Sequence, residues 1–259
     1  MLLLLLLAAS YALWIRWICR RCRADGARFG RTQSSGGLRA LLVTAHPDDE
    51  CMFFAPTIIE LVKSEASVHL LCLSSGNYYG QGPLRQKELV ESAAVLGIPA
   101  SRVTVADREE LPDDPRAKWS ISLASSLILK HITAQSIDVV LTFDGRGVSG
   151  HANHIAVHQA LSYLASSGKI PDGCHVLALC SISMFRKYLS VLELPVSWLF
   201  PSDFCFVIGM EEHKQAKKAM RCHRSQLLWF RHLYLIFSRY MWVNTFRVVV
   251  QEKQVLKFY

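Results

Sequence analysis

Two short clusters of polar residues carry the chemistry that this sequence could perform. The first, Ala-His-Pro-Asp-Asp-Glu at 45–50, follows an apolar run and holds one imidazole and three carboxylates. The second, His-Ala-Asn-His at 151–154, follows another apolar run at 139–143. A His and an Asp from the first cluster and a His from the second could bind zinc and leave one position open for water. An open position distinguishes a catalytic zinc site from a structural one.

The spacing within the clusters suggests which residues could bind the metal and which could transfer protons. His46 and Asp49 can face one ion from a tight loop, and His151 and His154 share a face at a predicted helix start. The histidine of this second pair that lies nearer to the metal would complete the site. Asp48 could then act as general base on a water, and the other histidine could stabilise an oxyanion or donate a proton. This assembly suits metal-assisted hydrolysis of an amide.

Each cluster also has a less specific interpretation. The first could be an exposed acidic turn, and its carboxylates could bind magnesium or calcium, although histidine favours zinc and similar metals. Glu50 could only cap the following helix, where a carboxylate offsets the helix dipole. His158 and His223 are interpreted as structural residues.

Alternating strands and helices must position these clusters. From Leu38 onward the apolar patterns predict an α/β domain, with a Rossmann-like, mostly parallel sheet and helices on both faces. The predicted strands are 38–45, 67–73, 102–106, 137–143, 175–181 and 204–208, and the predicted helices are 52–64, 84–96, 118–133, 151–166 and 211–223. Ligands bind such sheets beyond the carboxyl ends of the strands, where both clusters fall. We therefore expect the fold to bring them together.

The beginning of the chain predicts a membrane anchor. Residues 1–19 contain a leucine run and three interfacial aromatic residues, and a basic block follows them. We expect an uncleaved transmembrane helix over 1–19, with a cleaved signal peptide as the alternative. The basic block then places the rest of the chain in the cytosol. Residues 20–37 are predicted to be a basic linker, and 38–259 the catalytic domain.

The net charge of +8 suggests an anionic partner, either a lipid surface or nucleic acid. Nucleic acid is disfavoured because the early basic residues follow the membrane segment and no recognised nucleic-acid motif is present. Near the C-terminus, 227–243 alternates large apolar residues with Arg231 and Arg239, which predicts an interfacial helix on the membrane. The alternative is an ordinary helix packed on the sheet.

The two clusters resemble the motifs of the LmbE-like zinc de-N-acetylases. The similarity covers roughly 38–231, with Ala-His-Pro-Asp-Asp-Glu at 45–50 and Gly-Val-Ser-Gly-His-Ala-Asn-His at 147–154. The N-terminal anchor and the segments Cys-His-Arg-Ser-Gln and Trp-Phe-Arg at 222–231 are most similar to the branch that acts on N-acetylglucosaminyl-phosphatidylinositol in GPI-anchor biosynthesis. The resemblance implies an enzyme of the endoplasmic reticulum membrane, facing the cytosol, that removes the acetyl group from this glycolipid.

The resemblance also implies roles for individual residues. It assigns five of them to the reaction: His46, Asp49 and His154 as zinc ligands, Asp48 as the base, and His151 as the oxyanion and proton-transfer residue. Arg85 resembles the family's substrate-binding arginine, although a helix-surface salt bridge with Glu88 is the alternative. One departure is Asn153, where bacterial relatives often have Asp, because a neutral amide cannot supply that charge.

Two other functions agree with parts of the sequence. A de-N-acetylase of a soluble amino-sugar conjugate would share the motifs but would need no membrane tether. A non-catalytic binding protein of the membrane surface would need no base beside the metal, so Asp48 and His151 argue against it.

Overall fold

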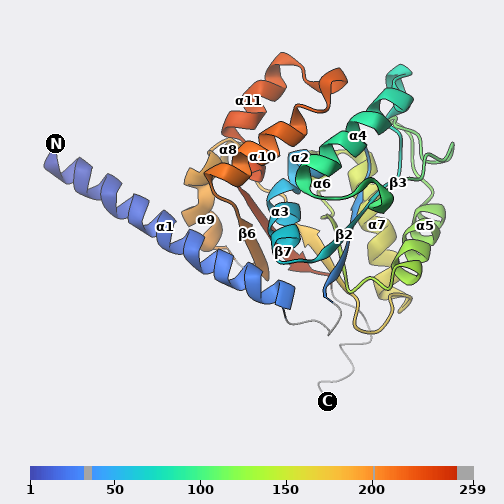
Figure 1. Ribbon diagram of the computed structural model, residues 1–259, viewed down its shortest axis with the longest axis horizontal. Coiled ribbons are helices and arrows are strands. Elements are labelled where there is room, and N and C mark those ends of the chain that lie inside the picture. Colours follow the sequence, from blue (N-terminus) through green and yellow to red (C-terminus); the bar gives the residue numbers. More distant parts are fainter. Residues whose placement is uncertain (32–36, 201, 250–259) are drawn as a thin grey trace.

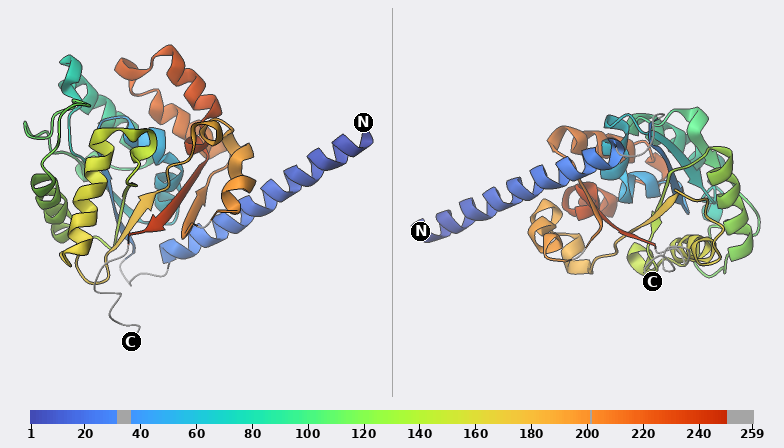
Figure 2. Two further views of the ribbon diagram at one scale, coloured as in Figure 1. Left: turned by 180° about the vertical axis from the view of Figure 1, so that it is seen from behind. Right: turned by 90° about the horizontal axis from the view of Figure 1, so that it is seen from below.

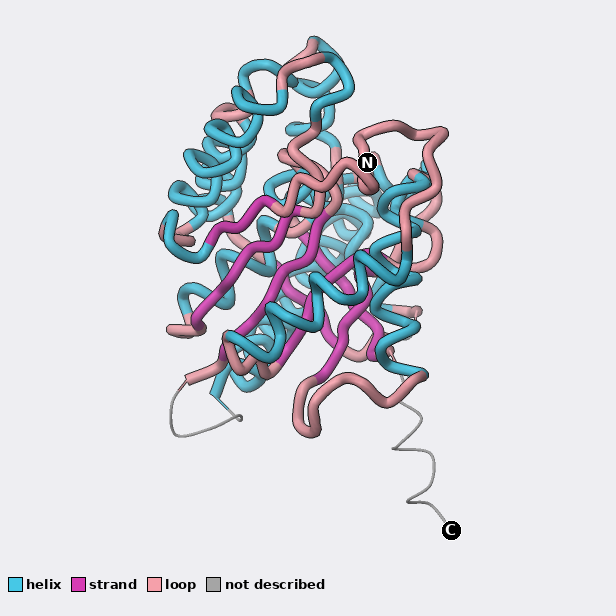
Figure 3. Tube along the Cα trace, turned by 90° about the vertical axis from the view of Figure 1, so that its right-hand side faces the viewer, coloured by secondary structure: helices cyan, strands magenta, loops and turns pink. Residues whose placement is uncertain are grey.

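A seven-stranded β-sheet forms the centre of the protein. The structure, a computed structural model, describes residues 1–31, 37–200 and 202–249. The strands lie in the order β3-β2-β1-β4-β5-β7-β6, and Figure 3 shows them crossing the middle of the molecule among the helices. Their bounds are β1 Arg39–Thr44, β2 Ser67–Cys72, β3 Val103–Val105, β4 Val139–Phe143, β5 His175–Leu179, β6 Phe204–Val207 and β7 Val243–Val248.

Helices cover both faces of this sheet. The α-helices are α1 Leu2–Arg31, α2 Asp49–Phe53, α3 Ala55–Lys63, α4 Gly82–Leu96, α5 Ile121–Ala134, α6 Gly147–Gly150, α7 Ala152–Ser166, α8 Met184–Lys187, α9 Leu194–Trp198, α10 Met210–Met220 and α11 Trp229–Phe237. The 3-10 turns are η1 Asn77–Tyr79, η2 Ala100–Arg102, η3 Ser190–Glu193, η4 Arg224–Gln226 and η5 Arg239–Met241. Figure 1 shows α11 at the top of the molecule, and Figure 2 shows α5 and α7 on the reverse side.

The side chains of β1 show why both faces are covered. Ala40 and Leu42 belong to a core shared with α2, α3, α4 and α10, whereas Leu41 and Val43 belong to a core shared with α5 and α7. Successive side chains of a strand point to opposite faces, so a strand that is apolar throughout needs cover on both sides. The predicted α/β fold is confirmed.

The sheet is parallel on one side and antiparallel on the other. The pairs β1–β2, β1–β4, β2–β3 and β4–β5 are parallel, while β7 runs antiparallel between β5 and β6. The sequence did not predict β7. The single helix expected over 227–243 is wrong in its second half, because α11 ends at Phe237 and η5 and β7 follow. Pairing with two distant strands decides the conformation of this segment.

The N-terminal segment forms one helix, α1, through the predicted anchor and most of the predicted linker. Ile18 and Cys22 of α1 are buried against Val207 of β6 and Val243 of β7. Figures 1 and 2 show that the N-terminal part of α1 extends away from the rest of the molecule. A transmembrane helix was expected over 1–19. No helix in the described residues is both long and apolar enough to span a membrane.

Candidate active site

The segments that follow β1 and β4 lie next to each other, because these two strands pair at the centre of the sheet. In the sheet β2 lies on one side of β1, and β4 and β5 lie on the other side. This reversal of strand order is the usual ligand position in an open α/β sheet. The structure brings His46, Asp48, Asp49, His151 and His154 to one cleft, as the sequence predicted.

Asp49 and His154 are held in this cleft by backbone groups and, for His154, by a stacked ring. Asp49 Oδ2 accepts hydrogen bonds from the backbone N–H groups of Ala45 (3.0 Å) and His46 (2.9 Å). His154 Nδ1 lies 3.1 Å from the carbonyl oxygen of Gly147, and its ring stacks on Phe143 at a centroid distance of 4.0 Å. Burial opposes ionisation of both side chains, but each stabilises the charge of the other. As a result, the pKa of Asp49 is lowered and that of His154 is raised.

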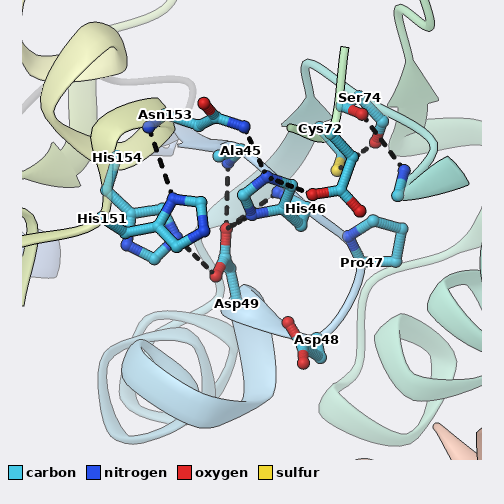
Figure 4. A network of polar contacts seen from close by, with 12 residues as sticks. Ala45, His46, Pro47, Asp48, Asp49, Cys72, Ser74, His151, Asn153 and His154 are labelled. Atoms are coloured by element: carbon cyan, nitrogen blue, oxygen red, sulfur yellow. Dashed lines mark hydrogen bonds and ion pairs between the residues drawn. The ribbon is translucent and has the colours of Figure 1, made fainter. Parts of the chain in front are cut away.

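The contacts of His154 fit a metal ligand. Its Nε2 atom is buried and has no hydrogen-bond partner among the described residues, although Asp49 Oδ1 lies 3.0 Å away. A cation between this nitrogen and the carboxylate would satisfy both, and zinc accepts both ligand types. Figure 4 shows Asp49 pointing toward the histidines.

His46 is oriented by a carboxylate that the sequence analysis missed. His46 Nε2 lies 3.1 Å from Asp113 Oδ1 and 2.9 Å from the amide nitrogen of Asn153. A carboxylate beside one ring nitrogen fixes the proton there and leaves the other nitrogen, here Nδ1, as a ligand. The same amide nitrogen donates a hydrogen bond of 3.3 Å to the carbonyl oxygen of Pro112, whereas the buried Oδ1 of Asn153 has no partner among the described residues. Asp113 thus provides a negative charge that Asn153 cannot.

His151 caps α7 and lies beside the other two histidines. Its Nδ1 accepts a hydrogen bond of 3.3 Å from the backbone N–H of Asn153. Burial, together with His154 and His46, lowers the pKa of His151 to about 4. The ring is therefore neutral at pH 7, with its proton on Nε2 when Nδ1 accepts. His46, His151 and His154 also offer nitrogens within 4.8 Å of one another, which makes a second possible set of three metal ligands.

Asp48 is turned away from Asp49. Its backbone lies in the left-handed region at φ 113°, which residues other than glycine rarely adopt without strain. The turn directs Asp48 Oδ2 to the guanidinium of Arg231, 3.1 Å away on α11. Burial raises the pKa of Asp48, and Arg231 only partly offsets this effect. In Figure 4 Asp48 makes no polar contact with the other residues drawn. This carboxylate can accept a proton without also serving as a ligand.

Arg85 lies at the side of the cleft and is held by protein acceptors. Its two terminal nitrogens donate to the carbonyl oxygens of Gly76 and Pro47 and to the side chains of Asp113 and Gln226, at 2.6–3.0 Å. The alternative salt bridge with Glu88 is not formed, because Glu88 accepts from Ser225 instead. Arg85 therefore orders the loop that carries His46, and its contact with substrate stays a prediction.

Behind the cleft, Glu50 and His223 form a buried ion pair. Their side-chain atoms lie 2.8 Å apart, and Ser92 donates a hydrogen bond to the same carboxylate oxygen. The nearby Cys51 could in principle complete a second metal site with them. Burial raises the pKa of the Cys51 thiol well above its usual range, and the thiol donates to the carbonyl oxygen of Asp48 at 3.2 Å. Glu50 and His223 connect α2 to the segment after α10 and support the turn at Asp48.

Helices α8 and α11 cover the cleft, which has a volume of about 560 Å³. Its mouth is bordered by partly exposed apolar side chains that we call the apolar rim: Tyr188, Trp229, Phe230, Leu233 and Phe237. The predicted interfacial role of Arg239 is wrong, because this residue is fully buried and pairs with Glu193 at 2.8 Å. Arg231 likewise points to Asp48 rather than outward.

Comparison with known proteins supports the family that the motifs suggested. Residues 41–165 match the model of the PIG-L family, described as GlcNAc-PI de-N-acetylase. The chain is 49% identical over 247 residues to the N-acetylglucosaminyl-phosphatidylinositol de-N-acetylase of Bos taurus, covering 93% of this chain and 96% of that protein. The chain belongs to the GlcNAc-PI de-N-acetylase family.

Other GlcNAc-PI de-N-acetylase relatives and a solved structure agree. A probable N-acetylglucosaminyl-phosphatidylinositol de-N-acetylase of Schizosaccharomyces pombe is 37% identical, over 80% of this chain and 85% of that protein. The N,N'-diacetylchitobiose deacetylase of Pyrococcus horikoshii superposes with a TM-score of 0.61 at 17% identity, covering 88% of this chain and 89% of that one. At this identity the likeness shows the fold alone.

Within this member of the GlcNAc-PI de-N-acetylase family, the sequence identified the residues that follow β1 and β4 but missed their partners. These partners lie far along the sequence from the residues they contact: Asp113 contacts His46, Arg231 contacts Asp48, and His223 contacts Glu50. The only sequence signal for Arg231 and His223 was the segments Cys-His-Arg-Ser-Gln and Trp-Phe-Arg at 222–231, which could not indicate what they contact, and no signal pointed to Asp113.

Proposed function

We propose that this protein is a zinc-dependent hydrolase that removes the acetyl group from N-acetylglucosaminyl-phosphatidylinositol, giving glucosaminyl-phosphatidylinositol and acetate. One observation carries the proposal: adjacent carboxylates point to different partners in one cleft. Asp49 faces His154, and Asp48 faces Arg231. A ligand set with a separate base beside it is what hydrolysis of an amide requires.

Each residue of the cleft can take a separate role in the reaction. His46, Asp49 and His154 would hold the zinc ion, which would activate both the amide carbonyl and the attacking water. Asp48 would take a proton from that water, while Arg231 keeps its carboxylate in place. The neutral His151 would donate a hydrogen bond from Nε2 to the developing oxyanion. As the C–N bond breaks, the protonated Asp48 would return its proton to the leaving amine.

We further propose that the domain works on the cytosolic surface of the endoplasmic reticulum membrane. The apolar rim surrounds the mouth of the cleft, with Trp229 75% exposed. Leu5, Leu6, Leu7 and Trp14 of α1 are also exposed. Exposed apolar groups of this kind gain free energy by entering the interface of a bilayer. The substrate carries its own acyl chains, so a cleft with an apolar mouth suits it.

Acetate release and metal content, measured on the purified protein, test the activity. We expect release from N-acetylglucosaminyl-phosphatidylinositol, its loss after chelation, and its return when zinc is added. Release only from a soluble N-acetylated amino sugar would favour the soluble-substrate enzyme. Zinc binding without any release would favour the non-catalytic binding protein.

Vesicle flotation tests the membrane contact. Trp229→Ser combined with Phe237→Ser should weaken flotation, because both side chains belong to the apolar rim. Tyr163→Ser on α7 is the matched control, since it removes an exposed aromatic ring outside the cleft. Equal flotation of the rim variant, the control and the wild type would show that the rim is not needed for membrane binding and that the exposed apolar residues of α1 suffice.

A further inference from the structure

Lys187, the last residue of α8, is a buried cation that the reaction does not use. It lines the cleft and is only 7% exposed. Its Nζ atom is surrounded by rings, with the centroids of Phe53, Tyr188 and Tyr234 at 6.0, 5.7 and 5.6 Å. The ammonium group therefore lies in an apolar wall of the cleft and faces its interior.

No carboxylate of the described residues forms an ion pair with Lys187. Burial lowers the pKa of this lysine, and the next largest influence is the like charge of Arg231. Removing an ammonium group from water without a counter-charge is costly, so buried lysines are normally paired. The surrounding rings offset only part of this cost. An anion in the cleft would complete the environment of Lys187.

The position of Lys187 determines where such an anion would lie relative to the reacting groups. The ring of Phe53 is near both sites, 5.8 Å from the ring of His154 and 6.0 Å from Lys187 Nζ. The same nitrogen lies 5.7 Å from the ring of Tyr188, which belongs to the apolar rim. The proposed substrate has the same order of groups: a reacting amide on the sugar, then inositol, then a phosphodiester, then acyl chains.

We propose that Lys187 binds the phosphodiester of the glycolipid and thereby selects phosphorylated inositol glycolipids over phosphate-free sugars. This inference rests on the proposed function. A lysine that holds a remote group of the substrate contributes equally before and during the reaction, so its loss raises KM and leaves kcat almost unchanged.

The test compares two substrates of the full chain in neutral detergent. One is a short-chain N-acetylglucosaminyl-phosphatidylinositol, and the other is N-acetylglucosaminyl-inositol without phosphate. Lys187→Met keeps the unbranched stem and removes the charge, and Lys130→Met on the exposed side of α5 is the matched control. With the first substrate, Lys187→Met should raise KM roughly 10- to 100-fold, as expected for a charged hydrogen bond. With the second substrate it should change nothing, and Lys187→Arg should recover most of the affinity.

Other outcomes would overturn the inference. Equal losses on both substrates would mean that Lys187 only maintains the shape of the cleft. A loss seen only in vesicles with anionic lipids would mean that Lys187 binds a neighbouring headgroup instead. If the wild type released acetate from neither substrate, the proposed function itself would fail. Calorimetric binding of myo-inositol 1-phosphate to the wild type and to Lys187→Met would then still test the anion site, and equal affinities would exclude it.

Discussion

The floor and the cover of the cleft are built in opposite ways. The floor consists of the proposed metal ligands after β1 and β4, of which Asp49 and His154 are held by backbone atoms at 2.9–3.1 Å. The cover consists of α8 and α11, helices of 4 and 9 residues that present exposed aromatic side chains. Of its cations, Lys187 lines the cleft and Arg231 reaches Asp48 with its side chain.

This difference suggests that the two regions serve different parts of the reaction. Groups that act on reacting atoms need positions fixed by a rigid framework, and the parallel strands supply it. The part that meets a lipid can be less regular, because acyl chains need apolar area more than exact geometry. Variants of the floor should therefore change metal content and kcat, whereas variants of the cover should change stability, KM and membrane binding.

The largest effects are expected from the two carboxylates where floor and cover meet. Asp49→Ala should lose metal and activity together, because Asp49 faces His154 in the floor. Asp48→Asn should keep the metal and lose about 10²–10⁴-fold in turnover, the usual contribution of a general base. Metal analysis of both purified variants, alongside acetate release, checks this. An Asp48→Asn protein without metal would show that Asp48 belongs to the ligand set.

Arg239 tests whether α8 of the cover depends on the buried carboxylate of Glu193, which pairs with both Arg239 and Arg186 of α8. Arg239→Met leaves Glu193 with one partner fewer and removes hydrogen bonds to Ser197 and Thr245. Breaking a buried pair in this way costs about 3–5 kcal/mol of unfolding free energy, measurable by urea unfolding. Arg221→Met, at an exposed position, is the control and should cost almost nothing. A stable Arg239→Met protein that instead left vesicles would restore the interfacial role first expected for this residue.

His151 distinguishes the two possible ligand sets of the floor. If it stabilises the oxyanion, His151→Ala should keep the metal and lose roughly 10²–10³-fold in kcat. His154→Ala should lose the metal, since its Nε2 faces Asp49. Parallel metal analysis decides the point. An empty site in His151→Ala would favour coordination by His46, His151 and His154.

The smallest effect concerns the pH dependence of the Glu50–His223 pair. The pKa of Glu50 is lowered from 4.5 in the folded state, so its contribution to stability is complete above pH 4.5 and disappears as the pH falls through the lowered value. The pKa of His223 is raised from 6.5, so its contribution is complete below pH 6.5 and disappears as the pH rises through the raised value. Urea unfolding should therefore show His223→Gln furthest below the wild type between about pH 4.5 and 6.5. A difference independent of pH up to 8.5 would contradict this ion pair.

The floor could be predicted from the sequence, and the cover could not. Polar clusters that directly follow apolar strands meet at one edge of a parallel sheet, so local patterns were sufficient to bring His46 and His154 together. The cover depends on contacts between distant residues. Arg239 was interpreted as a surface cation because Glu193, its partner, lies 46 residues earlier in the chain. Apolar periodicity cannot indicate that a charge will be buried, nor that a final strand will insert between two others.

The inserted strand β7 has a consequence for synthesis of the chain on the ribosome. The parallel strands β1–β5 are complete by residue 179, and they can pair as soon as they have emerged. In the described residues β6 pairs only with β7, whose first residue is Val243 of a 259-residue chain. Until β7 has been made, β5 and β6 both have a free edge that another chain could occupy. A premature stop codon shortly before position 243 should therefore yield aggregating protein rather than a shortened enzyme.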